Sequence, residues 1–129
     1  MKKPRILLVD DEMAFADNLM KILSKRGYDV IVVYNGADAV SMIGEKEFDV
    51  IILDMKMPGM NGIATLKEIK KKTPFVEVVI LTGHGSVESG IEGMQLGAFD
   101  FLMKPVKVDD LQEKVSEAYR RKLVQGKRG

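Results

Sequence analysis

The chain has 129 residues, 46% of them hydrophobic, which suits one domain with a single large core. Its 20 basic and 19 acidic residues give a net charge of +1, so no overall field attracts the protein to nucleic acid or to an anionic membrane. Cysteine is absent, which excludes disulfides, thiolate catalysis and cysteine metal sites and is compatible with a reducing compartment.

The first apolar run covers only residues 6–9 before two aspartates interrupt it. Such a run is too short for a signal peptide or a membrane helix, and no later stretch approaches the length of a membrane span. We therefore expect a soluble, cytoplasmic protein. We expect residues 1–124 to form the domain and residues 125–129 to be a C-terminal tail or the start of a linker.

Apolar strand-like runs alternate with helical periodicities five times along the chain. The alternation is typical of βαβ units and predicts an α/β fold with a mostly parallel sheet covered on both faces. The predicted strands are residues 5–9, 30–33, 50–53, 78–81 and 101–103.

The helices between these strands carry apolar residues at steps of three and four. Gly27 and Gly44 are expected to end the first two helices, and Thr73-Pro74 the third, because proline disfavours helical geometry in the residue before it. The residues of the apolar faces are Ala16, Leu19, Met20 and Leu23, then Ala39, Val40 and Ile43, then Ile63, Leu66 and Ile69.

The fourth helix, predicted within residues 86–97, contains Gly90 and Gly93. Each glycine costs about 1 kcal/mol relative to alanine, so we expect this helix to be the least stable. The fifth helix begins after Val108 and is expected to fray from Lys122 onward.

Polar side chains follow four of the five strands at their carboxyl ends. A doubly wound sheet of five strands commonly takes the order 2-1-3-4-5, which makes strands 1 and 3 neighbours. Asp10 and Asp11 should then face Asp54, with Thr82 and Lys104 beside them. The sequence therefore predicts one cluster of these groups at one edge of the sheet.

Three carboxylates held this close repel one another by about 4 kcal/mol for each pair at 4 Å, with an effective dielectric constant of about 20. Such a cluster calls for a cation, and a set of oxygen ligands favours Mg²⁺. With a metal ion and Lys104 in place, Asp54 could accept a phosphoryl group while Thr82 donates a hydrogen bond to it.

Each residue also has an ordinary structural interpretation. Asp10 is a suitable N-cap for the first helix, Lys104 could be a solvated lysine, and Thr82 has good strand propensity. The single histidine, His84, lies in a glycine-flanked turn and is expected to be exposed and idle. Lys56 could border the phosphate or simply face solvent.

Four segments together resemble the signature of the response-regulator receiver domains of two-component systems. These CheY-like domains have a flavodoxin-like fold. The resemblance runs from about Arg5 to Val124 and points to the enhancer-binding group of regulators. Phe101 stands where the family often has tyrosine, so a hydrogen bond from a phenol hydroxyl is lost there. The matching segments are Asp10-Asp11, residues 54–59, Leu81-Thr82-Gly83 and Lys104-Pro105.

The resemblance implies a role for each of these residues. Asp54 would be the phosphoacceptor, Lys104 would pair with the phosphoryl group, and a cis Lys104-Pro105 bond would aim its ammonium into the site. Thr82 would be the switch hydroxyl, and the rotamer of Phe101 would follow it. The implied Mg²⁺ ligands are Asp11, Asp54 and the Met55 carbonyl, with Asp10 acting through water.

The implied function is a regulatory switch rather than an enzyme, although such a domain assists its own phosphorylation and dephosphorylation. A histidine kinase or phosphotransfer protein would donate the phosphoryl group, and the face built by helix 4, strand 5 and helix 5 would transmit the signal to an effector. The resemblance leaves room for a phosphorylation-dependent dimer. It implies no direct nucleic-acid or membrane binding by this domain.

Two rival functions use related chemistry. A Mg²⁺-dependent phosphatase with an aspartyl-phosphate usually carries its nucleophile after the first strand, whereas Asp54 follows the third. A flavodoxin-like FMN carrier needs a glycine-rich phosphate loop after the first strand, where this chain has Asp10-Asp11.

Overall fold

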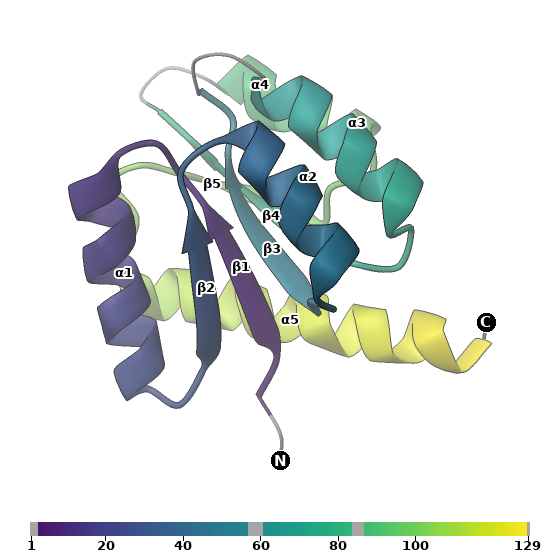
Figure 1. Cartoon of the computed structure of the whole chain (residues 1–129), viewed down its shortest axis with the longest axis horizontal. Helices are drawn as coiled ribbons and strands as arrows, with labels where there is room; N and C mark the ends of the chain where they lie inside the picture. The colour runs from purple at the N-terminus through teal and green to yellow at the C-terminus, as the bar shows by residue number, and fades with distance from the viewer. Residues whose placement is uncertain (1–2, 57–60, 84–86, 129) are drawn as a thin grey trace.

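The computed structural model describes residues 3–56, 61–83 and 87–128, with side-chain surroundings through residue 125. Its five strands form one parallel sheet in the order β2-β1-β3-β4-β5, which confirms the predicted topology (Figure 1). The strands are β1 Arg5–Val9, β2 Asp29–Val33, β3 Val50–Asp54, β4 Glu77–Thr82 and β5 Asp100–Met103.

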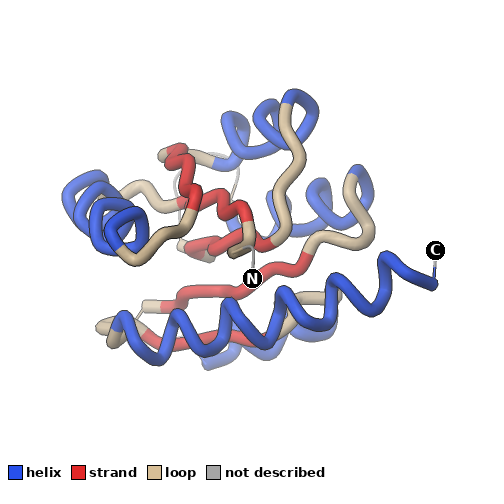
Figure 2. The backbone as a smooth tube through the Cα atoms, turned by 90° about the horizontal axis from the view of Figure 1, so that it is seen from below, coloured by secondary structure: helices blue, strands red, loops and turns tan. Residues whose placement is uncertain are grey.

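Five helices alternate with the strands and enclose the sheet from both sides (Figures 1 and 2). The helices α1 and α5 pack on one face, and α2, α3 and α4 cover the other. Their bounds are α1 Met13–Lys25, α2 Gly36–Glu45, α3 Gly62–Lys72, α4 Val87–Gln95 and α5 Val108–Arg128.

Alternate residues of the central strands point to opposite faces of the sheet. Leu7 and Ile51 pack under α2 and α3, whereas Leu8 and Ile52 pack under α1 and α5. All four side chains are fully buried, so both layers of helices are held by apolar contact with the same strands. This double burial explains the continuous apolar runs in the sequence.

The two glycines of α4 are close-packing positions. A Cβ atom on Gly90 would lie 2.5 Å from the Phe101 ring, and one on Gly93 would lie 2.0 Å from Cδ1 of Ile80. The predicted helix is present, but helix propensity did not show why glycine is needed there. Without side chains at these two positions, α4 can rest directly on β4 and β5.

The predicted fraying of the last helix is wrong, because α5 continues to Arg128. Ion pairs attach its later turns to the sheet: Arg121 binds the buried Glu77, and Nζ of Lys122 lies 2.5 Å from Oδ1 of Asp49. Burial would raise the pKa of Asp49, but hydrogen bonds from Arg5 and Lys122 outweigh it and lower that pKa. The helix extends past the sheet toward the C-terminus (Figure 1).

Among the residues that the structure describes, no helix is both long and apolar enough to cross a membrane. The last three residues of the matching segment 54–59, and His84, lie outside the described residues.

The packing predicts opposite effects for two glycine-to-alanine changes. Gly93→Ala should destabilise the fold by about 2 kcal/mol, because the methyl group would overlap Ile80. Gly44→Ala is the matched control in α2, where a Cβ atom meets nothing within 4 Å, and it should stabilise by about 0.5 kcal/mol. Urea unfolding followed by circular dichroism measures both. A Gly93→Ala variant as stable as wild type would contradict the close packing.

Candidate functional site

The carboxyl ends of four neighbouring strands bring the predicted residues together. Val9 of β1 pairs in register with Leu53 of β3, so Asp10 and Asp54 follow side by side. Thr82 ends β4, which is the next strand, and Lys104 follows β5. The convergence expected from the topology is therefore present in the structure.

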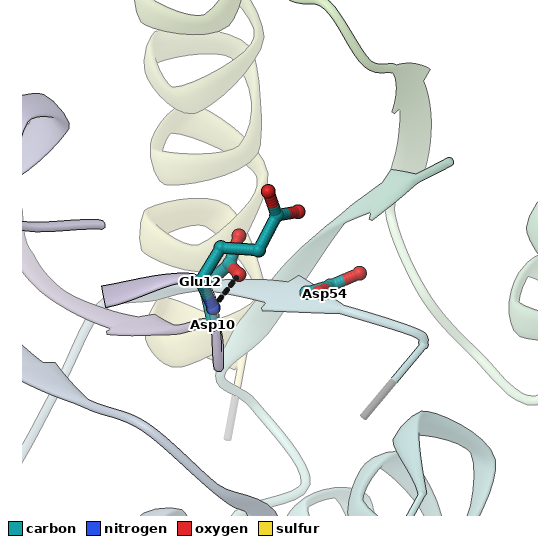
Figure 3. Close-up of side chains that lie close together, drawn as sticks. All are labelled: Asp10, Glu12 and Asp54. Carbon is teal, nitrogen blue, oxygen red and sulfur yellow. Dashed lines mark hydrogen bonds between the residues drawn. The ribbon is translucent and has the colours of Figure 1, made fainter. Parts of the chain in front are cut away.

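Three carboxylates gather at this edge (Figure 3). One oxygen each of Asp10, Glu12 and Asp54 lies within 4.8 Å of the others. Asp10 and Asp54 are buried, whereas Glu12 is exposed. Asp10 does not act as the N-cap of α1, because Glu12 holds that position and its backbone N–H donates to Oδ1 of Asp10 at 2.9 Å.

Lys104 supplies the positive charge among these carboxylates. Its Nζ lies 2.8 Å from Oδ2 of Asp10, 2.8 Å from Oε1 of Glu12 and 3.7 Å from Oδ2 of Asp54. Burial would lower the pKa of Lys104, but the contacts with Asp10 and Glu12 prevail and raise it. The Lys104-Pro105 bond is cis, as the resemblance predicted.

The surroundings of Asp54 disfavour a negative charge on its carboxyl group. Burial is the largest influence and raises the pKa of its carboxyl to about 7, and the charge of Asp10 acts in the same direction. The Lys56 backbone N–H, which donates to Oδ1 of Asp54 at 3.1 Å, and Lys104 lower the pKa but do not compensate fully. An additional cation at this edge would stabilise the charged form of Asp54.

Two buried oxygens at the site lack hydrogen-bond partners among the described residues. They are Oγ1 of Thr82 and Oδ2 of Asp10. Asp10 still has its ion pair with Lys104, which is close but not aligned as a hydrogen bond, whereas the Thr82 hydroxyl has no such contact. A buried hydroxyl without a partner is costly, so a ligand oxygen at this position would satisfy it.

The structure places the remaining predicted residues as follows. The Met55 carbonyl accepts a 3.2 Å hydrogen bond from the Gly62 N–H, which leaves one of its lone pairs for a cation. Phe101 is partly buried on β5 and lies against Gly90 of α4. Asp11 is partly exposed and is not a member of the group of three carboxylates. Its role as a metal ligand stays a prediction.

Glu12 is the residue that the sequence reasoning missed. It directly follows the aspartate pair, and its position as the first residue before α1 suggested nothing beyond the helix start. The available signal was its place beside two residues already assigned to the site. Together these oxygen groups fit a hard divalent cation such as Mg²⁺, because each is a carboxylate, a carbonyl or a hydroxyl.

The raised pKa predicts that Asp54→Asn stabilises the metal-free protein above neutral pH. A folded-state pKa of about 7, against an ordinary 3.8, means that ionisation of Asp54 opposes folding as the pH rises between these values. In a chelator at about pH 8, the variant should gain about 2 kcal/mol, and the gain should shrink toward pH 4. Denaturant unfolding at several pH values measures this.

The control is Asp110→Asn, because Asp110 is exposed in the first turn of α5. This variant should show no comparable dependence on pH. Equal stability of wild type and Asp54→Asn at about pH 8 would contradict the electrostatic account of the site.

Comparison with known proteins places these features in one family. Residues 6–116 match the model of the response regulator receiver domain. The chain is 42% identical over 113 residues to the transcriptional regulatory protein ZraR of Salmonella typhimurium, covering 88% of this chain and 26% of ZraR. It is 34% identical over 118 residues to the DNA-binding transcriptional regulator NtrC of Escherichia coli, covering 92% of this chain and 25% of NtrC.

Solved structures show the same fold. A response regulator receiver domain protein from Clostridium thermocellum has a TM-score of 0.89 and 38% identity, covering 94% of this chain and 98% of that one. NtrX from Brucella abortus has a TM-score of 0.92 and 31% identity, covering 97% of this chain and 29% of the NtrX chain.

The chain spans about a quarter of the length of the curated relatives that it matches. The matches to ZraR, NtrC and the regulatory protein LuxO of Vibrio cholerae agree with the regulator group that the sequence motifs indicated. The chain belongs to the response regulator receiver domain family of two-component systems.

Proposed function

We propose that this domain is a switch controlled by phosphorylation of Asp54, with a histidine kinase or phosphotransfer protein as the donor. The observation that carries the proposal is the setting of Asp54, a buried carboxylate beside Asp10 and Lys104 at the end of β3. The Thr82 hydroxyl at the same edge, which has no partner among the residues that the structure describes, provides a hydrogen-bond donor for a phosphoryl oxygen.

Phosphoryl transfer to Asp54 needs a positioned nucleophile and neutralisation of charge. A carboxylate oxygen of Asp54 attacks phosphorus, a P–O bond forms, and the bond between phosphorus and the donor breaks. The electron pair of the broken bond leaves with the donor. The product is an acyl phosphate on the protein, which water later hydrolyses to regenerate the carboxylate.

Mg²⁺ would neutralise negative charge on the carboxylates and on the phosphoryl oxygens. We propose Asp11, Asp54 and the Met55 carbonyl as its direct ligands and Asp10 as a ligand through water. The lone pair left on the Met55 carbonyl and the raised pKa of Asp54 support these two ligands, and the family resemblance supplies Asp11. In the same site, Lys104 pairs with a phosphoryl oxygen.

The switch step couples Thr82 to Phe101. When the Thr82 hydroxyl donates to a phosphoryl oxygen, it moves toward Asp54, and the ring of Phe101 on the neighbouring strand moves after it. The ring lies so close to Gly90 that a Cβ atom on this residue would be 2.5 Å from it. A shift of the ring therefore changes how α4 packs against the sheet. A change at Asp54 thereby reaches the surface of α4.

The face built by α4, β5 and α5 is the proposed output surface. Its α4 and β5 carry exposed apolar side chains, namely Val87, Ile91, Met94 and Met103. An effector domain or protein, or a second copy on phosphorylation, would bind there. We propose that the domain covers residues 1–124, acts in the cytoplasm and binds neither nucleic acid nor membrane directly.

The rival phosphatase function is not favoured. The family match covers most of the chain and identifies a regulatory domain, and Asp54 follows the third strand rather than the first. Regulatory use of the aspartyl phosphate therefore fits this chain better than turnover of a substrate.

The proposal predicts that a small acyl-phosphate donor with Mg²⁺ adds one labile phosphoryl group to the protein, which intact mass spectrometry detects. Asp54→Ala should abolish the addition, because it removes the nucleophile. Asp110→Ala, which changes an exposed aspartate on α5, should be labelled like wild type. Labelling that persists in Asp54→Ala, or its absence from wild type, would refute the proposal.

A further inference from the structure

Glu12 occupies the N-cap position of α1 but does not cap the helix. Its side chain makes no hydrogen bond to the backbone of the first turn. Instead its Oε1 accepts a hydrogen bond from Nζ of Lys104 at 2.8 Å, across 92 residues of sequence. The carboxylate therefore acts on Lys104, and the helix start gains nothing from it.

The ammonium of Lys104 is already shared among several groups. It contacts Asp10 and Glu12 at 2.8 Å each, lies 3.7 Å from Asp54, and stands 4.4 Å from the centre of the Phe15 ring. An ammonium has three hydrogens to donate. Its two short contacts are to Asp10 and Glu12, and Asp54 is farther away, so movement of the ammonium toward a phosphoryl group on Asp54 would lengthen at least one of these contacts.

Burial indicates which of the two contacts is released. The Asp10 side chain is fully buried, and a buried carboxylate that loses its cation is left uncompensated at high cost. The Glu12 side chain is 64% exposed, so water can solvate its carboxylate when the lysine leaves. Glu12 is thus the partner that can exchange.

We propose that Glu12 is a positioning residue that holds Lys104 in the unphosphorylated protein and releases it to the incoming phosphoryl group. The inference rests on the proposed function, because it assumes phosphoryl transfer to Asp54. Glu12 and the phosphoryl oxygens compete for one ammonium. Glu12 thereby sets how readily the site accepts a donor, without contacting the reacting atoms.

Competition for Lys104 predicts a specific kinetic effect of Glu12→Gln. At saturating Mg²⁺, the donor concentration for half-maximal labelling of Asp54 should fall about two- to fivefold, as expected for loss of an exposed ion pair. The maximal rate should stay unchanged, because the variant alters binding of the donor and leaves the chemical step intact. Labelling rates against acyl-phosphate concentration measure both.

Two control variants distinguish loss of the Glu12–Lys104 contact from mere loss of a negative charge. Glu12→Asp keeps the charge, but the shorter side chain should cap α1 instead of reaching Lys104, so it should behave like Glu12→Gln. Glu113→Gln removes one exposed negative charge on α5 and should behave like wild type. If Glu12→Asp matches wild type, or Glu113→Gln matches Glu12→Gln, the positioning role is refuted.

A measurement without any donor distinguishes this inference from the proposed function. The side-chain ¹⁵N resonance of Lys104 should shift in Glu12→Gln relative to wild type, because its ammonium loses a hydrogen bond. A shifted resonance with no labelling of Asp54 in any variant would refute the proposed function but would confirm the contact between Glu12 and Lys104. Normal labelling with an unshifted resonance and an unchanged half-maximal donor concentration would refute the role of Glu12 alone.

Discussion

The repulsion between Asp10 and Asp54, held side by side at the end of two buried strands, is the constraint on which the site depends. The parallel register of β1 and β3 forces these carboxylates together, and burial denies them the solvation that would make the charges tolerable. Burial and, to a lesser extent, the charge of Asp10 keep the pKa of Asp54 raised even with Lys104 nearby. The site is consequently suited to bind a cation.

The same crowding of charges bears on how phosphorylation of Asp54 would change the surface of α4. The Thr82 hydroxyl has no partner among the described residues, Lys104 contacts three carboxylates, and the Phe101 ring packs against Gly90. Under the proposed function, each of these groups would move when a phosphoryl group arrives, since each would gain or exchange a partner. The rest of the sheet is packed on both faces, so we expect the change to be confined to this edge and to α4.

The sequence predicted the sheet order and the meeting of Asp10, Asp54, Thr82 and Lys104, because strand runs and polar strand ends are local features that topology rules connect. It did not predict contacts that depend on packing. The long reach of Lys104 to Glu12, the need for glycine at position 93 and the anchoring of Lys122 on Asp49 all join residues distant in sequence. No periodicity or motif carries such information.

The most direct test of the account is a crystal structure of the protein with Mg²⁺ and beryllium trifluoride, a mimic of the phosphoryl group. The account predicts beryllium bonded to a carboxylate oxygen of Asp54, a metal ion held by the neighbouring acidic groups, and a hydrogen bond from the Thr82 hydroxyl to a fluorine. Beryllium trifluoride bound at another residue, or a metal ion away from Asp54, would contradict the central claim.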